Sequence, residues 1–416
     1  MRILVVWPDD FDRKCFSRVK GHQFFFTENG PDHWVPDPDF DPVQYFHRCL
    51  TAARDHQVDA VVSTHDLGDL VAAAIARKLD LRGPDPEAVF RCLHKYYGRL
   101  LEPNAVGSVP LPLAGQEHCH HYPAFVKPPW LKLGLLGFKV ENNRELAAAL
   151  GVARREYPRW SRQYYPLFEQ AIDISRYPLA TADIMLVEDF VEGPQVTVEG
   201  WVQDQQISLW GITDTNTYPG TRVIDGFSSP SRLPPDMQNA IGDYSRAVIE
   251  RHGLDDTFFN LELWVTEDGF RLTEVNSRAA VCFAGIYRPA LAASIFAAVA
   301  DVACGLAPRR RPQPTGLVAG QFNLVSLGPG RAGDLVDYEA SAAVAGLKLF
   351  RPRGAFVAPT SEFGVVLGQF EVAGSSYDEI HAEAETVRRR VLVAESGSDD
   401  HRAVRPLGSQ PVVGVG

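Results

Sequence analysis

The stretch Phe259–Arg278, FNLELWVTEDGFRLTEVNSR, decides how the rest of the chain is interpreted. Two runs of alternating apolar residues flank Glu267-Asp268-Gly269, a pattern typical of a β-hairpin. A three-residue loop, with Gly269 in the left-handed conformation, would pair Thr266 with Phe270. This register predicts three further pairs across the hairpin: Trp264 with Leu272, Glu262 with Glu274, and Asn260 with Asn276.

A two-residue turn at Asp268-Gly269 is the alternative connection. It would shift the register by one residue and place the two glutamates on opposite faces. We favour the longer loop because it gathers Glu262, Glu274 and Asn276 on one face. Carboxylates directly opposite each other repel, but a divalent cation bound between them makes the arrangement favourable. Mg²⁺ is a suitable cation because it takes oxygen ligands. The other interpretation of this pair is a solvated polar face on an edge hairpin.

Length and composition limit the protein class. With roughly 150 residues per domain, a chain of 416 residues is expected to hold two to three domains. A net charge of −11, without a localised basic patch, argues against a nucleic-acid partner. The six cysteines show no CxxC spacing and are expected to be reduced. The apolar run Ala290–Ala300 is too short to cross a bilayer, and no signal peptide precedes the first predicted strand, so we expect a cytoplasmic protein.

The first part of the chain alternates strands and helices. Strands are expected at Arg2–Trp7 and Val58–Ser63, with a helix between them that is capped by Asp41-Pro42. A second helix is expected where Leu67, Leu70, Val71, Ala74 and Ile75 share one face. Asp85-Pro86 opens a third helix, which is expected to carry Lys95. This order predicts an α/β domain with a parallel, doubly wound sheet.

Here the hairpin residues identify a family resemblance. Glu262 and the run Glu274-Val275-Asn276-Ser277-Arg278 resemble the metal-binding and catalytic signature of the ATP-grasp ligases. The resemblance implies an α/β ATP-grasp fold and two Mg²⁺ ions that Glu262, Glu274 and Asn276 hold on the phosphates of ATP. It also implies that Arg278 steadies the phosphorylated or tetrahedral intermediate.

Upstream segments resemble the nucleotide-binding positions of this family. Lys95, near a helix end, and Lys127, at the end of an apolar strand before Pro128, match the two nucleotide lysines. The segment Gly134–Val140 matches the loop that covers the phosphates, although leucines replace the usual small polar residues. Its two glycines, Gly134 and Gly137, still permit close backbone approach.

The segment Ile184–Gly200 resembles the family's hinge and ribose segment. By position, Glu188 would accept a hydrogen bond from the adenine amino group. The backbone at Asp189 and Val191 would bond the adenine edge. Gln195 stands where the family usually has a ribose-binding glutamate, so the side chain there is uncharged.

Three other segments are interpreted more plainly. Glu117–His121 could suggest a metal site, but neighbouring residues of an extended stretch point to alternate sides, and a loop is preferred. Gly328–Gly333 formally matches GxGxxG, but its proline and the lack of a βαβ unit argue against a dinucleotide site. Ser376–Glu379 is expected to form a capping box that opens a final helix.

The resemblance also implies a division of the chain and a reaction. We expect a Rossmann-like domain at 1–90, an ATP-grasp domain at 91–310 with a lid at roughly 120–190, a small α+β domain at 311–395, and a disordered tail at 396–416. The implied reaction joins a small-molecule carboxylate and an amine, such as two amino acids, through an acyl phosphate. The resemblance implies no membrane partner and is compatible with a homodimer. The alternatives are carboxylation, ligation of a nucleotide precursor, or a non-catalytic ATP-binding protein, against which the intact Glu262, Glu274, Asn276 and Arg278 argue.

Overall fold

The computed structural model describes residues 1–31, 37–102, 107–114, 121–132, 134–218, 221–358 and 364–393. The chain divides into two compact units. The first unit holds residues 1–212, 233–284 and 294–311, and the second holds residues 213–232, 285–293 and 312–416. The three domain boundaries that the sequence suggests stay a prediction, and the predicted disordered tail lies outside the described residues.

The first unit begins with a parallel sheet in the order β2-β1-β3, as the alternating pattern predicts. Its strands are β1 (Arg2–Val5), β2 (Gln23–Phe26) and β3 (Ala60–Val62). The helices around it are α1 (Asp10–Phe16), α2 (Pro42–Asp55), α3 (Asp66–Lys78), α4 (Pro86–Leu93) and α5 (Lys95–Arg99).

The predicted aspartate caps are present, but the predicted third helix is broken. The side chain of Asp41 accepts from the backbone nitrogens of the first turn of α2, and that of Asp85 does the same for α4. His94 leaves the helical conformation, with φ −94° and ψ 94°, and separates α4 from α5. Lys95 therefore opens a new short helix instead of lying inside the third one.

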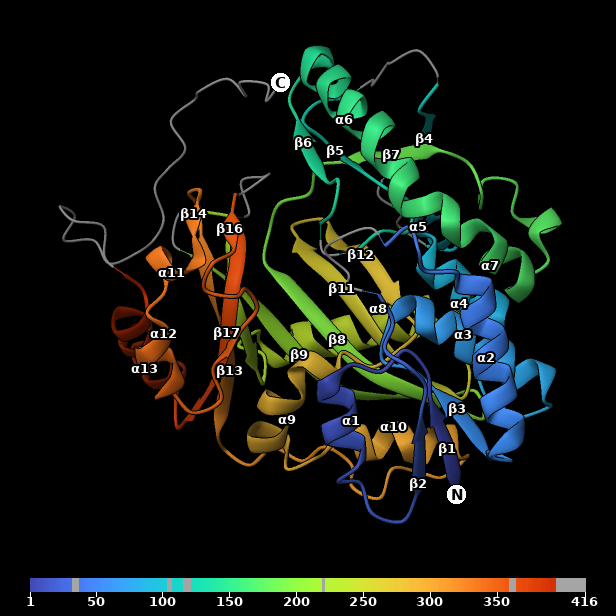
Figure 1. Cartoon of the computed structure of the whole chain (residues 1–416). Helices are drawn as coiled ribbons and strands as arrows, with labels where there is room; N and C mark the ends of the chain where they lie inside the picture. Colours follow the sequence, from blue (N-terminus) through green and yellow to red (C-terminus); the bar gives the residue numbers. More distant parts are fainter. Residues whose placement is uncertain are drawn as a thin grey trace. The chain divides into compact units, whose positions relative to one another are not determined.

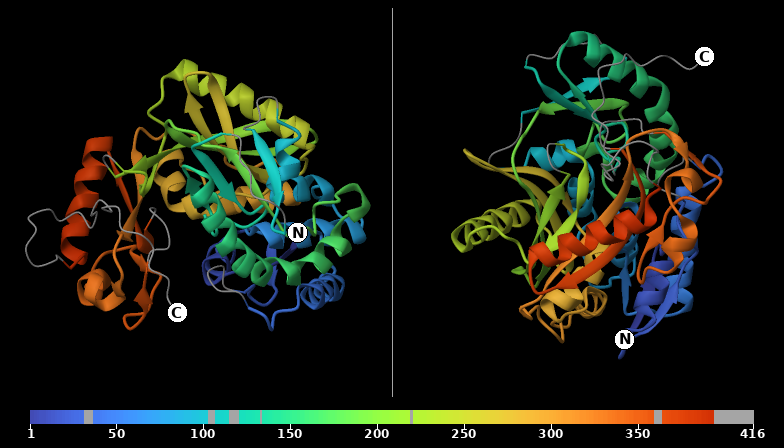
Figure 2. Two further views of the ribbon diagram at one scale, coloured as in Figure 1. Left: turned by 90° about the horizontal axis from the view of Figure 1, so that it is seen from above. Right: turned by 90° about the vertical axis from the view of Figure 1, so that its left-hand side faces the viewer.

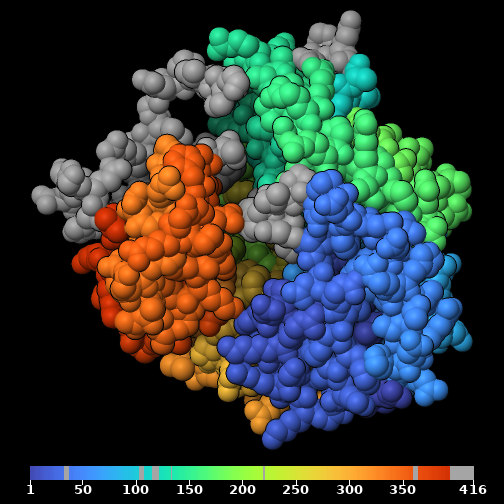
Figure 3. Space-filling model, viewed as in Figure 1, coloured from blue at the N-terminus to red at the C-terminus, as the bar shows by residue number. Residues whose placement is uncertain are grey.

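A second, antiparallel sheet in the first unit has the order β4-β7-β5-β6. Its strands are β4 (Ser108–Pro112), β5 (Ala124–Lys127), β6 (Phe138–Val140) and β7 (Ile184–Asp189). The long helix α6 (Asn143–Ser161) packs along this sheet, and η1 (Arg162–Tyr164), α7 (Tyr165–Ala171) and η2 (Ile174–Arg176) follow it (Figure 1). In the space-filling view the green surface of α7 adjoins the blue surface of α2 and α3 (Figure 3).

The hairpin belongs to a third sheet, whose order in the first unit is β12-β11-β8-β9. These strands are β8 (Gln195–Gln203), β9 (Gln206–Thr217), β11 (Thr257–Thr266) and β12 (Gly269–Asn276). Helix α8 (Pro235–His252) lies along one face of β11 and β12, as both views of Figure 2 show, and its buried Ile241, Val248 and Ile249 pack into the same core as Leu261 and Leu263. The short helix η3 (Val281–Phe283) and α10 (Ile295–Ala303) complete this unit.

The turn of the hairpin differs from the predicted one. Its loop contains two residues, Glu267 and Asp268, and the pairs next to it are Thr266–Gly269, Val265–Phe270 and Trp264–Arg271. The predicted three-residue loop, with its pairs Thr266–Phe270 and Trp264–Leu272, is therefore wrong. The alternative Asp268-Gly269 turn is not observed either.

A β-bulge restores the predicted register where the glutamates lie. Between the pairs Leu263–Leu272 and Glu262–Glu274 the register shifts by one residue, which leaves Thr273 as the extra residue. The predicted pairs Glu262–Glu274 and Asn260–Asn276 are confirmed. Because the side-chain period of a strand is two, this single bulge keeps both carboxylates on one face despite the shorter loop.

The second unit is an α+β assembly around a sheet in the order β9-β10-β13-β17-β15, in which β9 contributes residues 213–217. The other strands are β10 (Ile224–Ser229), β13 (Val318–Ser326), β15 (Lys348–Leu349) and β17 (Val365–Gly374), and β14 (Gly330–Arg331) pairs with β16 (Phe356–Val357). Its helices are α9 (Ala284–Leu291), α11 (Ala332–Leu335), α12 (Tyr338–Ala342) and α13 (Tyr377–Val391). At α13, Ser376 accepts from the backbone nitrogen of Glu379 as predicted, but the carboxylate of Glu379 accepts from Ser375 instead of closing the box on Ser376.

Among the described residues no single helix has both the length and the apolar composition needed to cross a membrane. The helical segments Val281–Leu291 and Ile295–Ala303 meet both criteria only when they are taken together, and the chain bends by 112° between them.

Candidate functional site

The centre of the candidate site is the carboxylate pair on the hairpin. Glu262 and Glu274 face each other on β11 and β12, and both are half-buried. Burial and the neighbouring Glu274 raise the pKa of Glu262 to about 8. Burial alone would also raise the pKa of Glu274, but the ammonium group of Lys95 holds it below its ordinary value. Ionising both carboxylates of such a directly opposed pair is unfavourable in free energy unless a cation binds between them.

Lys95 contacts this pair directly. Its Nζ lies 3.1 Å from Oε2 of Glu274 and donates a 2.8 Å hydrogen bond to the carbonyl oxygen of Leu131. The break at His94 starts α5 at Lys95, and the backbone nitrogen of Lys95 donates to the carbonyl of Pro129 at 2.6 Å. The helix break and this backbone hydrogen bond thus fix the position of the Lys95 backbone, from which the side chain extends toward Glu274.

A second cluster of charges joins β5 to β7. Oε2 of Glu188 accepts from Nζ of Lys127 at 2.6 Å and from Nη2 of Arg99 at 3.2 Å, while Oε1 accepts from Nε of Arg99 at 2.9 Å. Burial would raise the pKa of Glu188, but Lys127 and Arg99 hold it at about 2. Burial lowers the pKa of Lys127 to about 8, although Glu188 opposes the shift. Glu188 therefore holds two cations here, and its role toward adenine stays a prediction.

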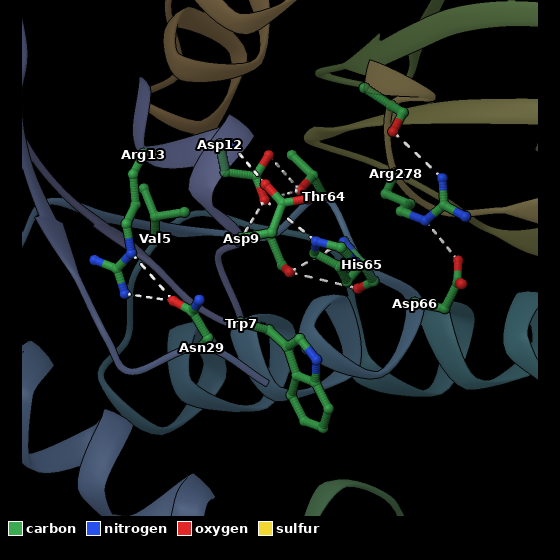
Figure 4. A network of polar contacts seen from close by, with 12 residues as sticks. Val5, Trp7, Asp9, Asp12, Arg13, Asn29, Thr64, His65, Asp66 and Arg278 are labelled. Atoms are coloured by element: carbon green, nitrogen blue, oxygen red, sulfur yellow. Dashed lines mark hydrogen bonds and ion pairs between the residues drawn. The ribbon is translucent and has the colours of Figure 1, made fainter. Parts of the chain in front are cut away.

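Arg278 is held by the N-terminus of α3. Its Nε donates to Oδ1 of Asp66 at 2.5 Å (Figure 4). Nζ of Lys132 lies 3.3 Å from the other oxygen of Asp66. Burial would raise the pKa of Asp66, but Arg278 and Lys132 hold it well below its usual range. One helical turn further along α3, Asp69 accepts from the hydroxyl of Ser277. These contacts tie the end of β12 to α3.

Asn276 is oriented by a buried polar chain. Its amide nitrogen lies 3.4 Å from Oδ1 of Asn260, and its Oδ1 lies 3.5 Å from Nη2 of Arg278. Asn260 in turn donates to Oε2 of the fully buried Glu199 at 2.9 Å, whose Oε1 accepts from the backbone nitrogen of Ala280 at 2.9 Å. These hydrogen bonds hold the side-chain amide of Asn276 on the same face of the hairpin as the two glutamates.

The predicted phosphate loop forms a tight turn. Gly134 has φ 68°, a conformation that favours glycine, and a Cβ there would meet no atom within 4 Å. The backbone nitrogen of Gly137 donates to the carbonyl of Gly134 at 3.0 Å. The open space beside Gly134 suits close approach of a ligand to the backbone.

The remaining predicted nucleotide residues lie at the ends of β7 and β8. Asp189 ends β7, and its carboxylate and its backbone nitrogen both bond the backbone of Gly107, at 3.1 and 3.2 Å. Val191 lies in the connection to β8, and the half-buried Gln195 is the first residue of β8. Their roles toward adenine and ribose stay predictions. Residues 117–120 of the suspected histidine-rich metal site lie outside the described residues.

A pocket with about 330 Å³ of open volume is lined by several of these charged and polar residues. Its polar lining consists of Asp66, Lys95, Lys132, Glu274, Asn276 and Ser277. Of the predicted site residues it contains Lys95, Glu274 and Asn276. Glu262 and Arg278 join it through the contacts given above, and Nζ of Lys127 lies 3.5 Å from the carbonyl oxygen of Thr273, the residue before Glu274. Oxygen donors, ammonium groups and a guanidinium in one place can hold a divalent cation together with phosphate and carboxylate groups.

No protein-family model matches the chain, and no curated protein matches it. Solved structures do match over nearly the whole chain. An L-amino acid ligase from Bacillus licheniformis has a TM-score of 0.71 at 17% identity, covering 95% of this chain and 98% of its own. A phosphoribosylglycinamide synthetase from Anaerococcus prevotii has a TM-score of 0.61 at 14% identity, covering 95% and 99%.

A third solved structure is the biotin carboxylase domain of the 2-oxoglutarate carboxylase from Hydrogenobacter thermophilus, in complex with MgADP, ADP and bicarbonate. It has a TM-score of 0.63 at 13% identity and covers 94% of this chain and 90% of its own. These structures share one architecture with this chain. The chain has the ATP-grasp fold.

Sequence reasoning missed three charged residues of the candidate site: Asp66, Arg99 and Lys132. Asp66 had a usable signal, because it opens the helix that follows the carboxyl end of the buried parallel strand β3 after three connecting residues, a position where ligands bind in open α/β sheets. Arg99 lies four residues after Lys95, but nothing in the sequence pairs it with Glu188. Lys132 lies in an irregular connection after β5 and carries no pattern.

Proposed function

We propose that this protein is an ATP-dependent carboxylate–amine ligase that forms an amide bond between amino acids, or between a small acid and an amine, and releases ADP and phosphate. One observation carries the proposal. Glu262 and Glu274 share one face of the hairpin, with Lys95 bound to Glu274 and with Arg278 on the same strand end.

The chemistry requires activation of the acid, because a free carboxylate has no good leaving group. An oxygen of the carboxylate attacks the γ-phosphorus of ATP, the bond to the bridging oxygen breaks, and ADP leaves. The amine then attacks the acyl carbon, loses a proton and displaces inorganic phosphate. Lys95 and Lys127 would offset the charge that develops on the phosphoryl oxygens, and Arg278 would hold the carboxylate and the later oxyanion with its planar fork.

The donor set fits Mg²⁺. Glu262, Glu274 and Asn276 offer hard oxygen ligands on one face, and burial together with the opposed Glu274 raises the pKa of Glu262, a shift that a bound cation would reverse. Bound there, Mg²⁺ would supply positive charge against the phosphate oxygens.

Lys127 is suited to contact phosphate oxygens, because its ammonium group is charged and held in place by Glu188. Its side chain is 10% exposed and its pKa of about 8 leaves it mostly protonated at neutral pH. The bond to Glu188 keeps the ammonium group in place before a nucleotide arrives. Glu188 would therefore position Lys127 as well as serve the adenine contact that the family resemblance implies.

The solved structures with the same fold support the proposal without deciding the substrates, since they include an amino-acid ligase, a nucleotide-precursor ligase and a carboxylase domain bound to MgADP. The high coverage and TM-score of the L-amino acid ligase favour amide formation. We further propose a cytoplasmic protein, and the homodimer stays a prediction.

An ADP-release screen tests the proposal. Purified protein with ATP and MgCl₂ is offered the twenty amino acids singly, in pairs, and with hydroxylamine as a general amine. We expect ADP release that depends on an amino acid, and a hydroxamate when hydroxylamine replaces the amine. ADP release that requires bicarbonate instead would support a carboxylase, and no substrate-dependent ADP release in any arm would contradict the ligase.

A further inference from the structure

Next to the charged pocket lies a second, larger and mostly apolar one, with about 540 Å³ of open volume, which is called the aromatic pocket after its three tryptophans and one tyrosine. Its apolar lining comes from the N-terminal sheet, α3, the segment after β5 and the α6–α7 region. The lining residues are Trp7, Pro31, Leu67, Leu93, Trp130, Leu131, Leu135, Trp160 and Tyr164, and its polar residues are His65, Asp66 and Lys132.

Trp7 is held in the wall of this pocket in a strained conformation. Its φ is 59°, which a bulky residue rarely adopts. Its backbone nitrogen donates to the hydroxyl of the fully buried Tyr45 at 2.7 Å and lies 3.3 Å from Oγ1 of Thr27. The indole packs edge-on against Phe40 and Tyr45, with ring centroids 5.2 and 5.1 Å away. Strain that the surroundings hold in this way is characteristic of ligand sites.

The neighbourhood of Trp7 is shaped around its indole. A Cβ at Gly30 would lie 1.6 Å from Nε1 of Trp7, so only glycine fits beside the ring. In Figure 4 the indole points away from the polar group of Asp9, Asp12 and His65. That polar group could by geometry hold a metal ion, but Asp12 already accepts from Thr64 and from the backbone of Asp9. The ring therefore serves the apolar pocket rather than that cluster.

The aromatic pocket meets the charged pocket at its polar end. The two pockets share Asp66, Leu93, Trp130 and Lys132. Asp66 and Lys132 lie 3.3 Å apart, and Arg278 binds the other oxygen of Asp66. Oδ2 of Asp66 is buried, and it forms an ion pair with Nζ of Lys132 at 3.3 Å but no hydrogen bond with the described residues, so it keeps the capacity to accept one from a ligand. The junction thus offers an acceptor for an ammonium group and two cations for a carboxylate.

We propose that the aromatic pocket is the side-chain subsite for the acid that is activated, and that this acid is an α-amino acid with a large apolar, preferably aromatic, side chain. The inference rests on the proposed ligase function, because it assigns the carboxylate to the cations beside Glu274. The α-ammonium group binds Asp66, the α-carboxylate faces Lys132 and Arg278, and the side chain fills the space between Trp7, Trp130 and Trp160. Glycine or alanine would leave that space unfilled, and a charged side chain there would be buried among the indole rings and leucines.

Binding can be measured without turnover, since three of the seven tryptophans line the pocket. L-phenylalanine, L-tryptophan, L-leucine, L-alanine and L-aspartate are titrated by isothermal calorimetry and, for the non-fluorescent ones, by intrinsic fluorescence. We expect phenylalanine, tryptophan or leucine to bind at least tenfold more tightly than alanine, because the larger side chains bury more apolar surface in the pocket. 3-Phenylpropionate and phenethylamine, which each lack one charged group, should both bind more weakly than phenylalanine.

A matched pair of variants on α3 locates the site. Leu67 lines the pocket, whereas Leu79, a half-buried leucine at the end of the same helix, does not. Leu67→Trp fills the pocket and should weaken phenylalanine binding at least tenfold, with Leu79→Trp unchanged. Leu67→Ala, which enlarges the pocket, serves if the tryptophan variant melts at a lower temperature, and it should change the rank order of the amino acids.

The outcomes separate the two proposals. Tight binding of phenylalanine that Leu67→Trp removes, without amino-acid-dependent ADP release, would keep the subsite and overturn the ligase. ADP release that alanine or aspartate stimulates better than any large apolar amino acid would keep the ligase and overturn the subsite. Equal effects of Leu67→Trp and Leu79→Trp on binding would also overturn the subsite.

Discussion

Replacing Glu188 by glutamine is expected to loosen the sheet that carries Lys127. The carboxylate, 5% exposed, accepts from Arg99 and Lys127, whose side chains are 4% and 10% exposed. Glutamine keeps the shape of the side chain but loses the charge and turns an amide NH₂ group toward a cation. Both Arg99 and Lys127 then lose the anion that offsets their burial.

Two independent estimates of the magnitude agree. The pKa of Glu188, held at about 2 instead of 4.5, corresponds to about 3 kcal/mol of preferential stabilisation of the buried carboxylate. Removing one partner of a buried ion pair costs about 3–5 kcal/mol in other proteins. Because the pKa is lowered, this stability is complete above about pH 4.5 and is lost as the pH falls toward 2.

Native-state hydrogen exchange measures the effect locally, which avoids treating a two-unit protein as a single two-state system. At pH 7 the backbone amides of β5 and β7 should exchange about a hundredfold faster in Glu188→Gln than in the wild type, since about 1.4 kcal/mol is a factor of ten. Glu141→Gln is the control, because Glu141 pairs with Lys139 in the same sheet but its side chain is 50% exposed, and exposed pairs contribute about 0–1 kcal/mol. Equal exchange in the wild type and Glu188→Gln would refute the reasoning.

Three further outcomes are expected. Glu274→Gln should abolish ATP turnover and lower the melting temperature by differential scanning fluorimetry, because Lys95 loses the carboxylate that it contacts, although relief of the opposed Glu262 offsets part of that loss; turnover that persists with Mg²⁺ would refute the metal role. Arg278→Lys should reduce hydroxamate formation at least tenfold and ATP affinity by calorimetry much less, since lysine lacks the fork; an equal loss of both would argue against a role at the acyl group. Hydrogen exchange at 134–140 should slow when ATP and Mg²⁺ bind, and unchanged exchange would mean that this loop does not cover the phosphates.

Local patterns predicted much of the fold. Proline after aspartate marked the starts of α2 and α4, and alternation marked both strands of the hairpin. The loop was wrong because a bulge at Thr273 is not encoded by alternation: an extra residue changes the pairing without changing which residues are apolar. The break at His94 was missed because the apolar spacing on either side fits one helix.

The candidate site was predicted only where its residues are close in sequence. Glu262, Glu274, Asn276 and Arg278 come from one hairpin, so their relation follows from its register. The bond from Arg278 to Asp66 spans 212 residues, and that from Arg99 to Glu188 spans 89. Such contacts depend on how the sheets of the first unit pack, which no local pattern specifies. The aromatic pocket could not be predicted from the sequence either, because its tryptophans, Trp7, Trp130 and Trp160, come from three separate segments.

The fate of an oxygen atom tests the central claim most directly. The amino acid that gives the fastest ADP release is labelled with ¹⁸O in its carboxylate, and the inorganic phosphate formed with ATP and amine is examined by mass spectrometry. If the carboxylate attacks the γ-phosphorus beside Glu262, Glu274 and Arg278, one ¹⁸O appears in each phosphate that accompanies an amide, and Glu274→Gln yields neither. If phosphate remains unlabelled, or AMP and pyrophosphate form instead of ADP, activation does not proceed through an acyl phosphate, and the proposed roles of Lys95, Lys127 and Arg278 are wrong.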